Sequence, residues 1–459
     1  MQRREFFTAA GSLGLTATGC TTQSEDGLSE RVKETEGGVQ SNDGAVIHNW
    51  ESEIMRGFPS APENQVTREN HEESVGKLRW AMQHWRELYP TQRVSRGASP
   101  VITLPRQDRD VMALQIADMG GGTSTVADEV RSLSMDAFVI LQHGKILCEH
   151  YFHGMRPETP HILYSMNKSI VSSVIATLLG DELRETAKIE EYVPQLKDTA
   201  YAGATIRQIL DMESGVLYGY TEDKSQFSVH EQAISPVAKE LGVPVGDYNF
   251  LRTLIPEKTR PHGYGMRYKE SDPGVLVWAA ERVTGKRFAQ LVQERLWGPL
   301  GCEFDMDAVC DPLGHFTYHL ACCLRDVARW GVMCLNKGRF NGQQIVPEEF
   351  FNDIQNNATV DRLTNSEFTG DLFPPETGYR SFFYHHRKHG RAIAAAGIYG
   401  QFCYMNPRSD IVIAFFSSTE PWGAQLAAKV PFDRILEKYR AQEIKRRHLC
   451  HEIARLLRQ

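Results

Sequence analysis

Ser165-Met166-Asn167-Lys168 is followed by an almost uncharged run, Ser169-Ile170-Val171-Ser172-Ser173-Val174-Ile175-Ala176-Thr177-Leu178-Leu179-Gly180. This pattern predicts a helix that begins near the serine and whose lysine enters a core. A helix places two side chains three residues apart on one face. A desolvated amine can take the proton of a neighbouring hydroxyl, and a helix N-terminus favours the negative charge that develops. Ser165 and Lys168 therefore predict acyl transfer by a serine hydrolase.

The Ser-x-x-Lys spacing alone does not decide the function. Ser74-Val75-Gly76-Lys77 has the same spacing, but it follows a charged stretch, residues 68–73, which predicts a solvated helix face. The alternative role for Ser165 is that of a helix cap. Other parts of the sequence have to choose between these two interpretations.

The composition excludes several classes of protein. The 459 residues are 41% hydrophobic and 24% charged, with a net charge of −7, which is typical of a globular protein. No basic patch is interleaved with aromatic residues, so no nucleic-acid partner is expected. His315 and His319 have the spacing of two metal ligands on a helix, but no third ligand is evident. We expect neither a metal ion nor another cofactor.

The N-terminus predicts export. Arg3-Arg4-Glu5-Phe6-Phe7 resembles a twin-arginine targeting motif, and the apolar stretch after it is too short to span a bilayer. Ala17-Thr18-Gly19-Cys20 resembles a bacterial lipoprotein cleavage site, with Cys20 as the lipidated residue, although Ala17 stands where Leu is usual. The alternative is a soluble exported protein cut nearby. We expect a periplasmic or membrane-anchored protein, with residues 1–20 as the export signal and 21–55 as a flexible tether.

Strand patterns stand at both ends of the remaining chain. Residues 137–141 and 146–152, joined by His143-Gly144, predict a hairpin, and four apolar segments over 382–417 predict further strands. Helices are expected over 66–88 and from about 424 to 458, and most of the middle of the chain reads as helical.

These elements predict an α+β fold over residues 56–459. Its sheet part is expected at about 100–160 and 376–459, and its mostly helical part at about 170–355. The early and late strands would pair in one antiparallel sheet flanked by helices, with the active site in the cleft between the two parts. The oligomeric state and the disulfide state stay open.

Two further segments could complete a site for acyl transfer. Tyr268 lies in a turn-like segment before a helix and could relay a proton to the leaving group; the alternative is an exposed aromatic residue. In Gly397-Ile398-Tyr399-Gly400-Gln401, Gly397 would let the backbone approach the substrate. The N–H groups of Ile398 and Ser165 could then bind the oxyanion, and the alternative is a plain turn or bulge.

The order of Ser165-x-x-Lys168, Tyr268 and the late glycine-rich strand resembles that of the serine β-lactamase and penicillin-binding-protein superfamily. Within it, the chain is most similar to the 6-aminohexanoate-dimer (nylon-oligomer) hydrolases and their carboxylesterase relatives. The similar segments follow one another from about residue 57 to 425: Trp80-Ala81, Glu87-Leu88-Tyr89-Pro90, Val94-Ser95-Arg96, Tyr164-Ser165-Met166-Asn167-Lys168-Ser169, Val193-Pro194-Gln195-Leu196, Ile209-Leu210-Asp211-Met212, Glu281-Arg282-Val283-Thr284-Gly285, Arg325-Asp326-Val327-Ala328-Arg329 and Gly397-Ile398-Tyr399-Gly400-Gln401.

The resemblance implies roles for individual residues. Ser165 would be the nucleophile, Lys168 the general base or its partner, and Tyr268 the proton relay, with the N–H groups of Ser165 and Ile398 as oxyanion donors. Tyr218 resembles the tyrosine that contacts the substrate's amide nitrogen. The substrate-binding residues expected in this way are Tyr218, Gly397 and Tyr399.

The positions that depart from the superfamily pattern narrow the range of expected substrates. Ala395 stands where β-lactamases place Lys or His, and Glu270 stands where they carry Asn, so penicillin is not the expected substrate. Tyr318-His319 replaces a pair that is often Gly in relatives, which predicts a different pocket wall. We expect a serine hydrolase acting on small amides or esters, tethered to a membrane by a lipid on Cys20. The alternatives are a β-lactamase or D-Ala-D-Ala carboxypeptidase-like enzyme, and a catalytically silent binding lipoprotein of the same fold.

Overall fold

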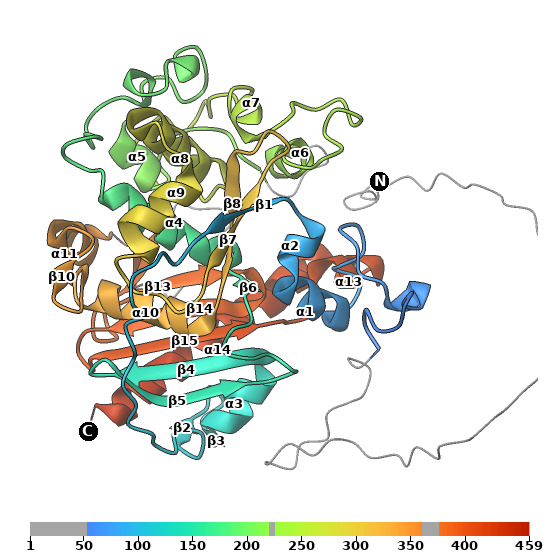
Figure 1. Ribbon diagram of the computed structural model, residues 1–459, viewed down its shortest axis with the longest axis vertical. Helices are drawn as coiled ribbons and strands as arrows, with labels where there is room; N and C mark the ends of the chain where they lie inside the picture. Colours follow the sequence, from blue (N-terminus) through green and yellow to red (C-terminus); the bar gives the residue numbers. More distant parts are fainter. Residues whose placement is uncertain (1–52, 220–224, 360–375, 459) are drawn as a thin grey trace, which may run out of the picture.

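A seven-stranded antiparallel sheet forms the centre of the computed structural model, which describes residues 53–219, 225–359 and 376–458 (Figure 1). The early hairpin of β4 (Met135–Gln142) and β5 (Lys145–Tyr151) joins the late strands through antiparallel pairing of β4 with β15 (Ile411–Ser417). The prediction that the two ends of the chain share one sheet is confirmed. The other strands, in order from the far edge, are β11 (Thr377–Arg380), β12 (Phe383–His386), β13 (Ala392–Gly397) and β14 (Gln401–Asn406).

Helices cover both faces of this sheet, which explains why β14 and β15 are buried along their whole length. Successive residues of a strand point to opposite faces. On one face, Cys403 of β14 lies against Gly331 of α10 (Leu324–Leu335), where an added Cβ would come within 3.0 Å of its Sγ. On the other face, Phe402 lies 5.9 Å from the guanidinium of Arg447 in α14 (Phe432–Leu457). The sheet is therefore the middle layer between these two helices.

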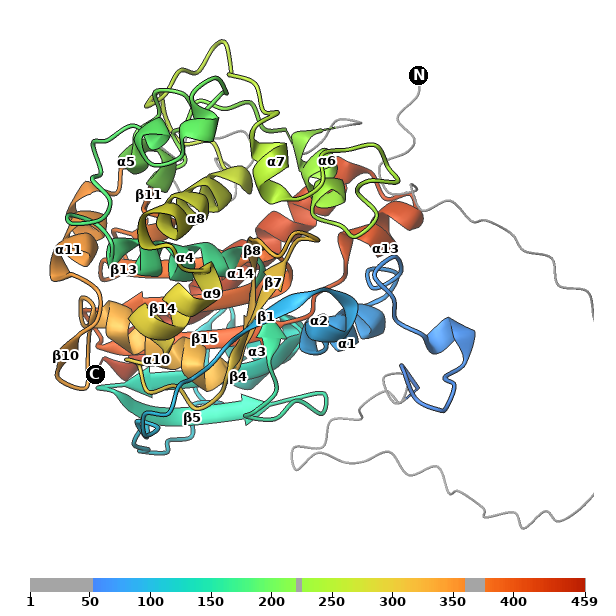
Figure 2. The same cartoon turned by 45° about the horizontal axis from the view of Figure 1, so that its top comes forward.

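The helical part packs on the α10 side of the sheet. Figure 2 shows α8 (Ser271–Thr284) above α4 (Asn167–Ala176), with α4 next to β13. All ten residues of α4 are buried, as its apolar sequence predicted. Helix α8 ends at Gly285, whose φ of 66° is the left-handed conformation that commonly terminates helices. The shorter helices of this part are α5 (Ile206–Leu210), α6 (Gln226–Ala233), α7 (Asp247–Leu251) and α9 (Phe288–Val292).

A second, four-stranded sheet takes two of its strands, β7 and β8, from the part of the chain that was expected to be mostly helical. Its order is β1 (Thr91–Val94), β7 (Met306–Cys310), β8 (Phe316–Cys322) and β6 (His161–Ile162). Short apolar runs do not distinguish a strand from a buried helix, so the sequence did not reveal these strands. One consequence is a correction: His319 lies in a strand and His315 just before it, so the two imidazoles do not share a helix face. His315 Nδ1 instead lies 3.1 Å from Asp311 Oδ2.

The expected helix over 66–88 is shorter and broken, because it consists of α1 (Val75–Gln83) and α2 (Trp85–Leu88). Ser74 caps α1, since its hydroxyl accepts the backbone N–H of Lys77 at 3.2 Å. Lys77 pairs with Glu73 at 2.8 Å and is buried, so the predicted solvated face is wrong for this lysine. The serine of the second Ser-x-x-Lys sequence is thus a helix N-cap.

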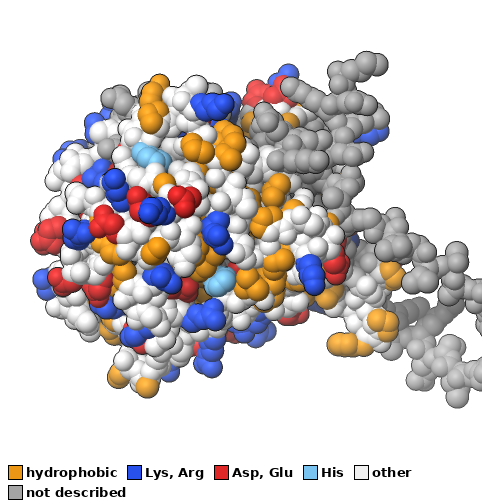
Figure 3. Space-filling view, turned by 90° about the horizontal axis from the view of Figure 1, so that it is seen from above, with side chains coloured by type: hydrophobic (Ala, Val, Ile, Leu, Met, Phe, Trp, Pro, Cys, Tyr) orange, Lys and Arg blue, Asp and Glu red, His pale blue; other side chains and the backbone are white. Residues whose placement is uncertain are grey.

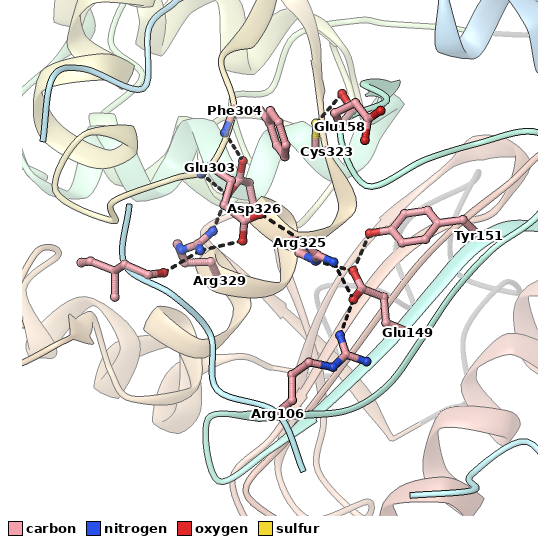
Figure 4. A network of polar contacts seen from close by, with 11 residues as sticks. Arg106, Glu149, Tyr151, Glu158, Glu303, Phe304, Cys323, Arg325, Asp326 and Arg329 are labelled. Atoms are coloured by element: carbon pink, nitrogen blue, oxygen red, sulfur yellow. Dashed lines mark hydrogen bonds and ion pairs between the residues drawn. The ribbon is translucent and has the colours of Figure 1, made fainter. Parts of the chain in front are cut away.

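A network of charged side chains around the buried side chain of Glu149 joins the edge strand β5 to α10 (Figure 4). Glu149 of β5 accepts hydrogen bonds from Arg325 of α10 at 2.5 and 3.0 Å and from Arg106 at 2.7 Å. Burial alone would raise the pKa of Glu149, but the hydrogen bonds from Arg325, Tyr151 and Arg106 hold it below its usual range. Glu149 therefore stays ionised and links the two elements.

The outer surface carries mixed charge. Basic and acidic side chains are interspersed among hydrophobic ones on the face shown in Figure 3. Within the described ranges, no helix is both long enough and apolar enough to cross a bilayer. The eight described cysteines are free and buried. The expected export signal, most of the tether and Cys20 lie outside the described residues.

Candidate active site

Ser165 and Lys168 stand together where the serine helix begins. Ser165 lies in the short turn η3 (Tyr164–Met166), and Lys168 lies in the first turn of α4. The Lys168 Nζ is 3.0 Å from the Ser165 Oγ. Lys168 is only 2% exposed, whereas Ser165 is partly exposed. The amine is thus sheltered from water while its hydroxyl partner remains open to a substrate.

Backbone strain and a close approach surround the serine. Tyr164, directly before Ser165, has a φ of 44°, which is uncommon for a residue with a side chain. Gly397, at the end of β13, lies against the same turn. A Cβ on Gly397 would collide with the Leu163 carbonyl and come within 3.1 Å of the Met166 nitrogen. The absence of a side chain at Gly397 is what lets this strand reach the nucleophile.

The chain turns sharply just after this contact. Ile398, Tyr399 and Gly400 form a short turn, η7, in which Tyr399 has a φ of 64° and Gly400 a φ of 103°. The Ile398 backbone therefore follows directly on the glycine that touches the Ser165 turn. The two segments from which the oxyanion donors were expected are adjacent in the structure.

Tyr268 reaches the site from the helical part. Its ring centroid lies 5.0 Å from the Lys168 Nζ, and its side chain is 7% exposed, so the alternative of an exposed aromatic residue is wrong. The next residue, Lys269, is fully buried and anchors this segment: its Nζ lies 3.1 Å from the Ser214 Oγ and 3.6 Å from an oxygen of Asp272. The backbone that presents Tyr268 is held by a buried polar cluster.

Glu270 completes the surroundings of the lysine. Its Oε2 forms a short, buried ion pair with the Lys168 Nζ, and the two side chains are 9% and 2% exposed. Burial lowers the pKa of Lys168, and the nearby charges of Glu270 and Glu231 oppose that effect only in part. The residues Ser165, Lys168, Tyr268 and Glu270 therefore form one contiguous cluster.

Tyr218 belongs to a second hydrogen-bonded chain. Its hydroxyl lies 2.8 Å from His230 Nδ1, and His230 Nε2 lies 2.5 Å from Asp247 Oδ1. All three side chains are buried. His319 connects this chain with the serine cluster: burial lowers its pKa to about 3, and the charges of Lys168 and His230 act in the same direction. His319 is therefore a neutral group near the serine cluster.

An aromatic wall lies beside the nucleophile. The Tyr164 ring is 5.7 Å from Trp85 of α2, 5.6 Å from His319 and 5.5 Å from Tyr399, each time edge to face. The Tyr399 hydroxyl donates to Glu72 at 2.7 Å. Tyr399, expected to bind substrate, is thus 3% exposed and fastens the N-terminal segment to the turn after Gly397.

The arrangement has the parts of an acyl-transfer site: a hydroxyl beside a buried amine, a phenol at the amine, and a glycine-lined backbone segment at the hydroxyl. The sequence pattern of the family described as "Beta-lactamase" matches residues 125–436, more than half of the chain, and this span contains all of these groups. The chain belongs to the beta-lactamase family. Its members share a serine-hydrolase fold, so the α+β fold expected from the sequence and the assignment as a hydrolase are confirmed.

Two relatives of this beta-lactamase family protein cover most of its length. It is 29% identical over 372 residues to the 6-aminohexanoate-dimer hydrolase of Paenarthrobacter ureafaciens, a match that spans 79% of this chain and 90% of the relative. Among solved structures, it is similar to a protein from Bacillus anthracis assigned as a 6-aminohexanoate-dimer hydrolase. That likeness has a TM-score of 0.68 and 25% identity, over 79% of this chain and 95% of the other.

In residues 53–219, 225–359 and 376–458, no group of three or more His, Cys, Asp or Glu side chains is placed to hold a metal ion.

Three features of the site were not anticipated from the sequence. Glu270 was visible as a departure from the superfamily pattern, but its contact with Lys168 was not expected. His230 and Asp247 lie in segments without a motif, so no signal pointed to them. Glu72 lies in the N-terminal charged stretch, far along the chain from the Tyr399 that it contacts.

Proposed function

We propose that this chain forms an acyl-enzyme at Ser165 and hydrolyses small amides or esters. The observation that carries the proposal is the 3.0 Å separation of the Ser165 Oγ from the buried Lys168 Nζ, with the Tyr268 ring at the same nitrogen. A linear amide, such as the dimer named for the Paenarthrobacter relative, is the first substrate to test.

In the proposed reaction, the Ser165 Oγ attacks the substrate carbonyl as its proton passes to Lys168. The backbone N–H groups of Ser165 and Ile398 bind the oxyanion that forms. Tyr268 relays a proton to the departing nitrogen or oxygen, because an amine leaves only when protonated. A water molecule then releases the acyl group by the same steps in reverse.

The β-lactam and D-Ala-D-Ala substrates considered from the sequence are less well supported. Ala395 of β13 is fully buried and carries no charge where a basic residue would grip a substrate carboxylate. Glu270 replaces a neutral amide group with a negative charge beside Lys168. Both residues favour a substrate without a carboxylate next to the scissile bond.

A reactive-serine label and a substrate panel test the proposal. A fluorophosphonate probe is expected to label the native protein and not Ser165→Ala, and hydrolysis of p-nitrophenyl acetate and of the 6-aminohexanoate dimer is expected to disappear in that variant. Ser74→Ala is the matched control, since Ser74 has the same spacing to a lysine but only caps a helix. It should retain activity and lose about 1 kcal/mol of stability. Unlabelled native protein would instead indicate a binding lipoprotein of this fold.

We place the enzyme outside the cytoplasm, held to a membrane by a lipid on Cys20. The twin-arginine pattern at Arg3-Arg4 and the cleavage-site pattern before Cys20 support this proposal. Mass spectrometry of the N-terminal peptide should find a diacylglycerol-modified Cys20. Cys20→Ala should move the protein from the membrane fraction to the soluble fraction, and an unmodified N-terminal peptide would contradict the proposal.

A further inference from the structure

Three polar groups follow one another into the protein at the start of α4. The exposed end is the Ser165 Oγ, the Lys168 Nζ lies behind it, and the Glu270 Oε2 lies behind the amine. Lys168 and Glu270 are both buried, so this contact is an ion pair removed from water. Glu270 directly precedes α8, on the segment that Lys269 anchors through Ser214 and Asp272.

This contact changes what the lysine can do. An ammonium group has three donors and no acceptor, so Lys168 cannot take the Ser165 proton while it keeps all of its own. Burial alone would favour the neutral amine, but the adjacent carboxylate favours the ammonium form. A proton must therefore leave the Lys168 nitrogen before or as the Ser165 proton arrives, and the neighbouring acceptor is the Glu270 Oε2.

The geometry points to Glu270 as the final acceptor of the Ser165 proton, with Lys168 passing the proton between them. This inference rests on the proposed acyl-enzyme mechanism and deepens it. Glu270 does not touch the substrate, so it is a positioning residue that acts through Lys168. The base of this enzyme is then a lysine–carboxylate pair rather than a lone amine.

The step conserves atoms and charge. The Ser165 Oγ–H bond breaks as the Oγ–carbon bond forms, and the carbonyl electron pair moves to the oxygen. The proton goes to Nζ of Lys168, and one of the protons already on Nζ goes to the Glu270 Oε2. When the bond to the leaving group breaks, Tyr268 protonates that group and regains its proton through Lys168, and Glu270 returns its proton to Nζ. The attacking water repeats the sequence.

Other titratable groups face the pair from every side, and the pH dependence belongs to the whole cluster. The charge of Glu231 in α6 raises the pKa of Lys168, and the charge of Lys168 lowers the pKa of His319 in β8. Burial raises the pKa values of Tyr379 in β11 and Tyr384 in β12, and Glu270 is one of the smaller charges that add to this effect. Variants at Glu270 therefore have to be compared by their pH–rate profiles and not at one pH.

The decisive variant is Glu270→Gln, measured as kcat/KM for p-nitrophenyl acetate from pH 5 to pH 10. Without the carboxylate, only the Lys168 amine can take the serine proton, and it can do so only after losing its own proton. We expect the acid limb of the profile to move to higher pH. The deficit against the native enzyme should be about 10²-fold or more at pH 6, within the range typical of general-base catalysis, and should shrink steadily toward pH 10.

Two further variants keep the inference falsifiable. Glu270→Asp retains a carboxylate and should restore the acid limb of the native enzyme, even if its rate is lower. Glu257→Gln breaks a partly buried ion pair, the 2.6 Å contact with Arg267 just before Tyr268, and should leave the shape of the profile unchanged. If Glu270→Gln does not fold, Glu270→Ala takes its place, because an acid limb that moves to higher pH supports the inference and an unmoved limb with an equal loss at every pH overturns it.

The outcomes separate this inference from the proposed function. A Glu270→Gln profile that keeps its acid limb, with fluorophosphonate labelling of Ser165 intact, overturns the role of Glu270 alone. Higher activity of Glu270→Gln at pH 7 also overturns it, because Glu270 would then only hold Lys168 in its inactive, protonated form. Failure to label Ser165 in the native protein would instead reject the acyl-enzyme itself.

Discussion

The Tyr218 hydroxyl lies 2.8 Å from the Nδ1 of His230, whose Nε2 is held 2.5 Å from the Asp247 carboxylate. The Asp247 carboxylate can only accept a hydrogen bond, so the Nε2 of His230 donates to it. In the neutral ring, Nδ1 is then the nitrogen that accepts from the Tyr218 O–H. The phenol proton is then directed toward His230, and a phenol oxygen also carries lone pairs that can accept a hydrogen bond. Such an oxygen can accept a hydrogen bond from the N–H of an amide, which an ester lacks.

Tyr218→Phe should separate amides from esters at the level of binding. Removal of one hydrogen bond costs about 1 kcal/mol, so KM for a short amide should rise roughly five- to tenfold with kcat little changed. The ester of the same acyl group should be almost unaffected. Tyr151→Phe is the matched control, because the Tyr151 hydroxyl donates to Glu149 at 2.6 Å on the edge strand β5. An equal change for amide and ester would contradict the role of Tyr218.

Tyr268→Phe should act on kcat instead. The variant keeps the ring over the Lys168 ammonium but loses the proton that an amine leaving group needs, so kcat for the amide should fall about 10²- to 10⁴-fold. A p-nitrophenyl ester, whose leaving group departs as an anion, should lose much less. Tyr264→Phe is the control, since Tyr264 belongs to the same segment and is exposed. The proposed relay fails if both substrates slow by the same factor.

Gly397→Ala should disable the site without touching a functional side chain. The added methyl group has to displace the Leu163 carbonyl and the Met166 nitrogen, and it therefore pushes β13 away from Ser165. We expect kcat to fall about 10²- to 10³-fold, which is the loss typical of a missing oxyanion donor.

The control for this change is Gly120→Ala, at an exposed turn where the new Cβ meets only a side-chain oxygen of Asp118 at 3.3 Å. Thermal melts should show a modest loss of stability for Gly397→Ala and almost none for Gly120→Ala. Native rates in Gly397→Ala would mean that the Ile398 backbone does not serve the oxyanion.

The seven-stranded sheet and the helix that follows Ser165 were predictable because patterns among neighbouring residues indicate both. The alternating and continuous apolar segments over 137–152 and 382–417 became β4, β5 and the late strands, and the uncharged run after Lys168 became α4. The order of the motifs along the chain then predicted that Ser165, Lys168, Tyr268 and Gly397 form one site. These residues were found because the chemistry of acyl transfer restricts the residue types and their order.

The second sheet and several contacts of the site depend on segments that are far apart in the chain. Strands β7 and β8 are short apolar runs that read equally well as helix, and only their pairing with β1 and β6 distinguishes them. The Glu270–Lys168 contact joins residues 102 positions apart, and Tyr399 meets Glu72 across 327 positions. No local pattern encodes such partners, since tertiary packing selects them. The division into signal, tether and hydrolase domain stays a prediction.

A cluster of three histidines, one buried and two partly buried, predicts a loss of stability in mild acid. The His451 ring is stacked 3.5 Å from His389 and lies 5.4 Å from His386. Burial lowers the pKa of His451 to about 3 and that of His386 well below its usual value, and the neighbouring cationic side chains add to both effects. The folded protein therefore keeps these imidazoles neutral, whereas the unfolded chain protonates them below about pH 6.5.

The sign of the effect follows from proton binding. Below pH 6.5 the unfolded state binds more protons than the folded state, so the free energy of unfolding falls as the pH drops, until it approaches the low pKa values of the folded protein. Each such histidine should contribute a loss of about 1–2 kcal/mol between pH 7 and pH 5. Urea unfolding at pH 7, 6 and 5 measures this loss in the free energy of unfolding. His451→Phe keeps a ring in the stack but removes the titrating group, so it should reduce the loss by that amount; an unchanged pH dependence would show that another group controls acid stability.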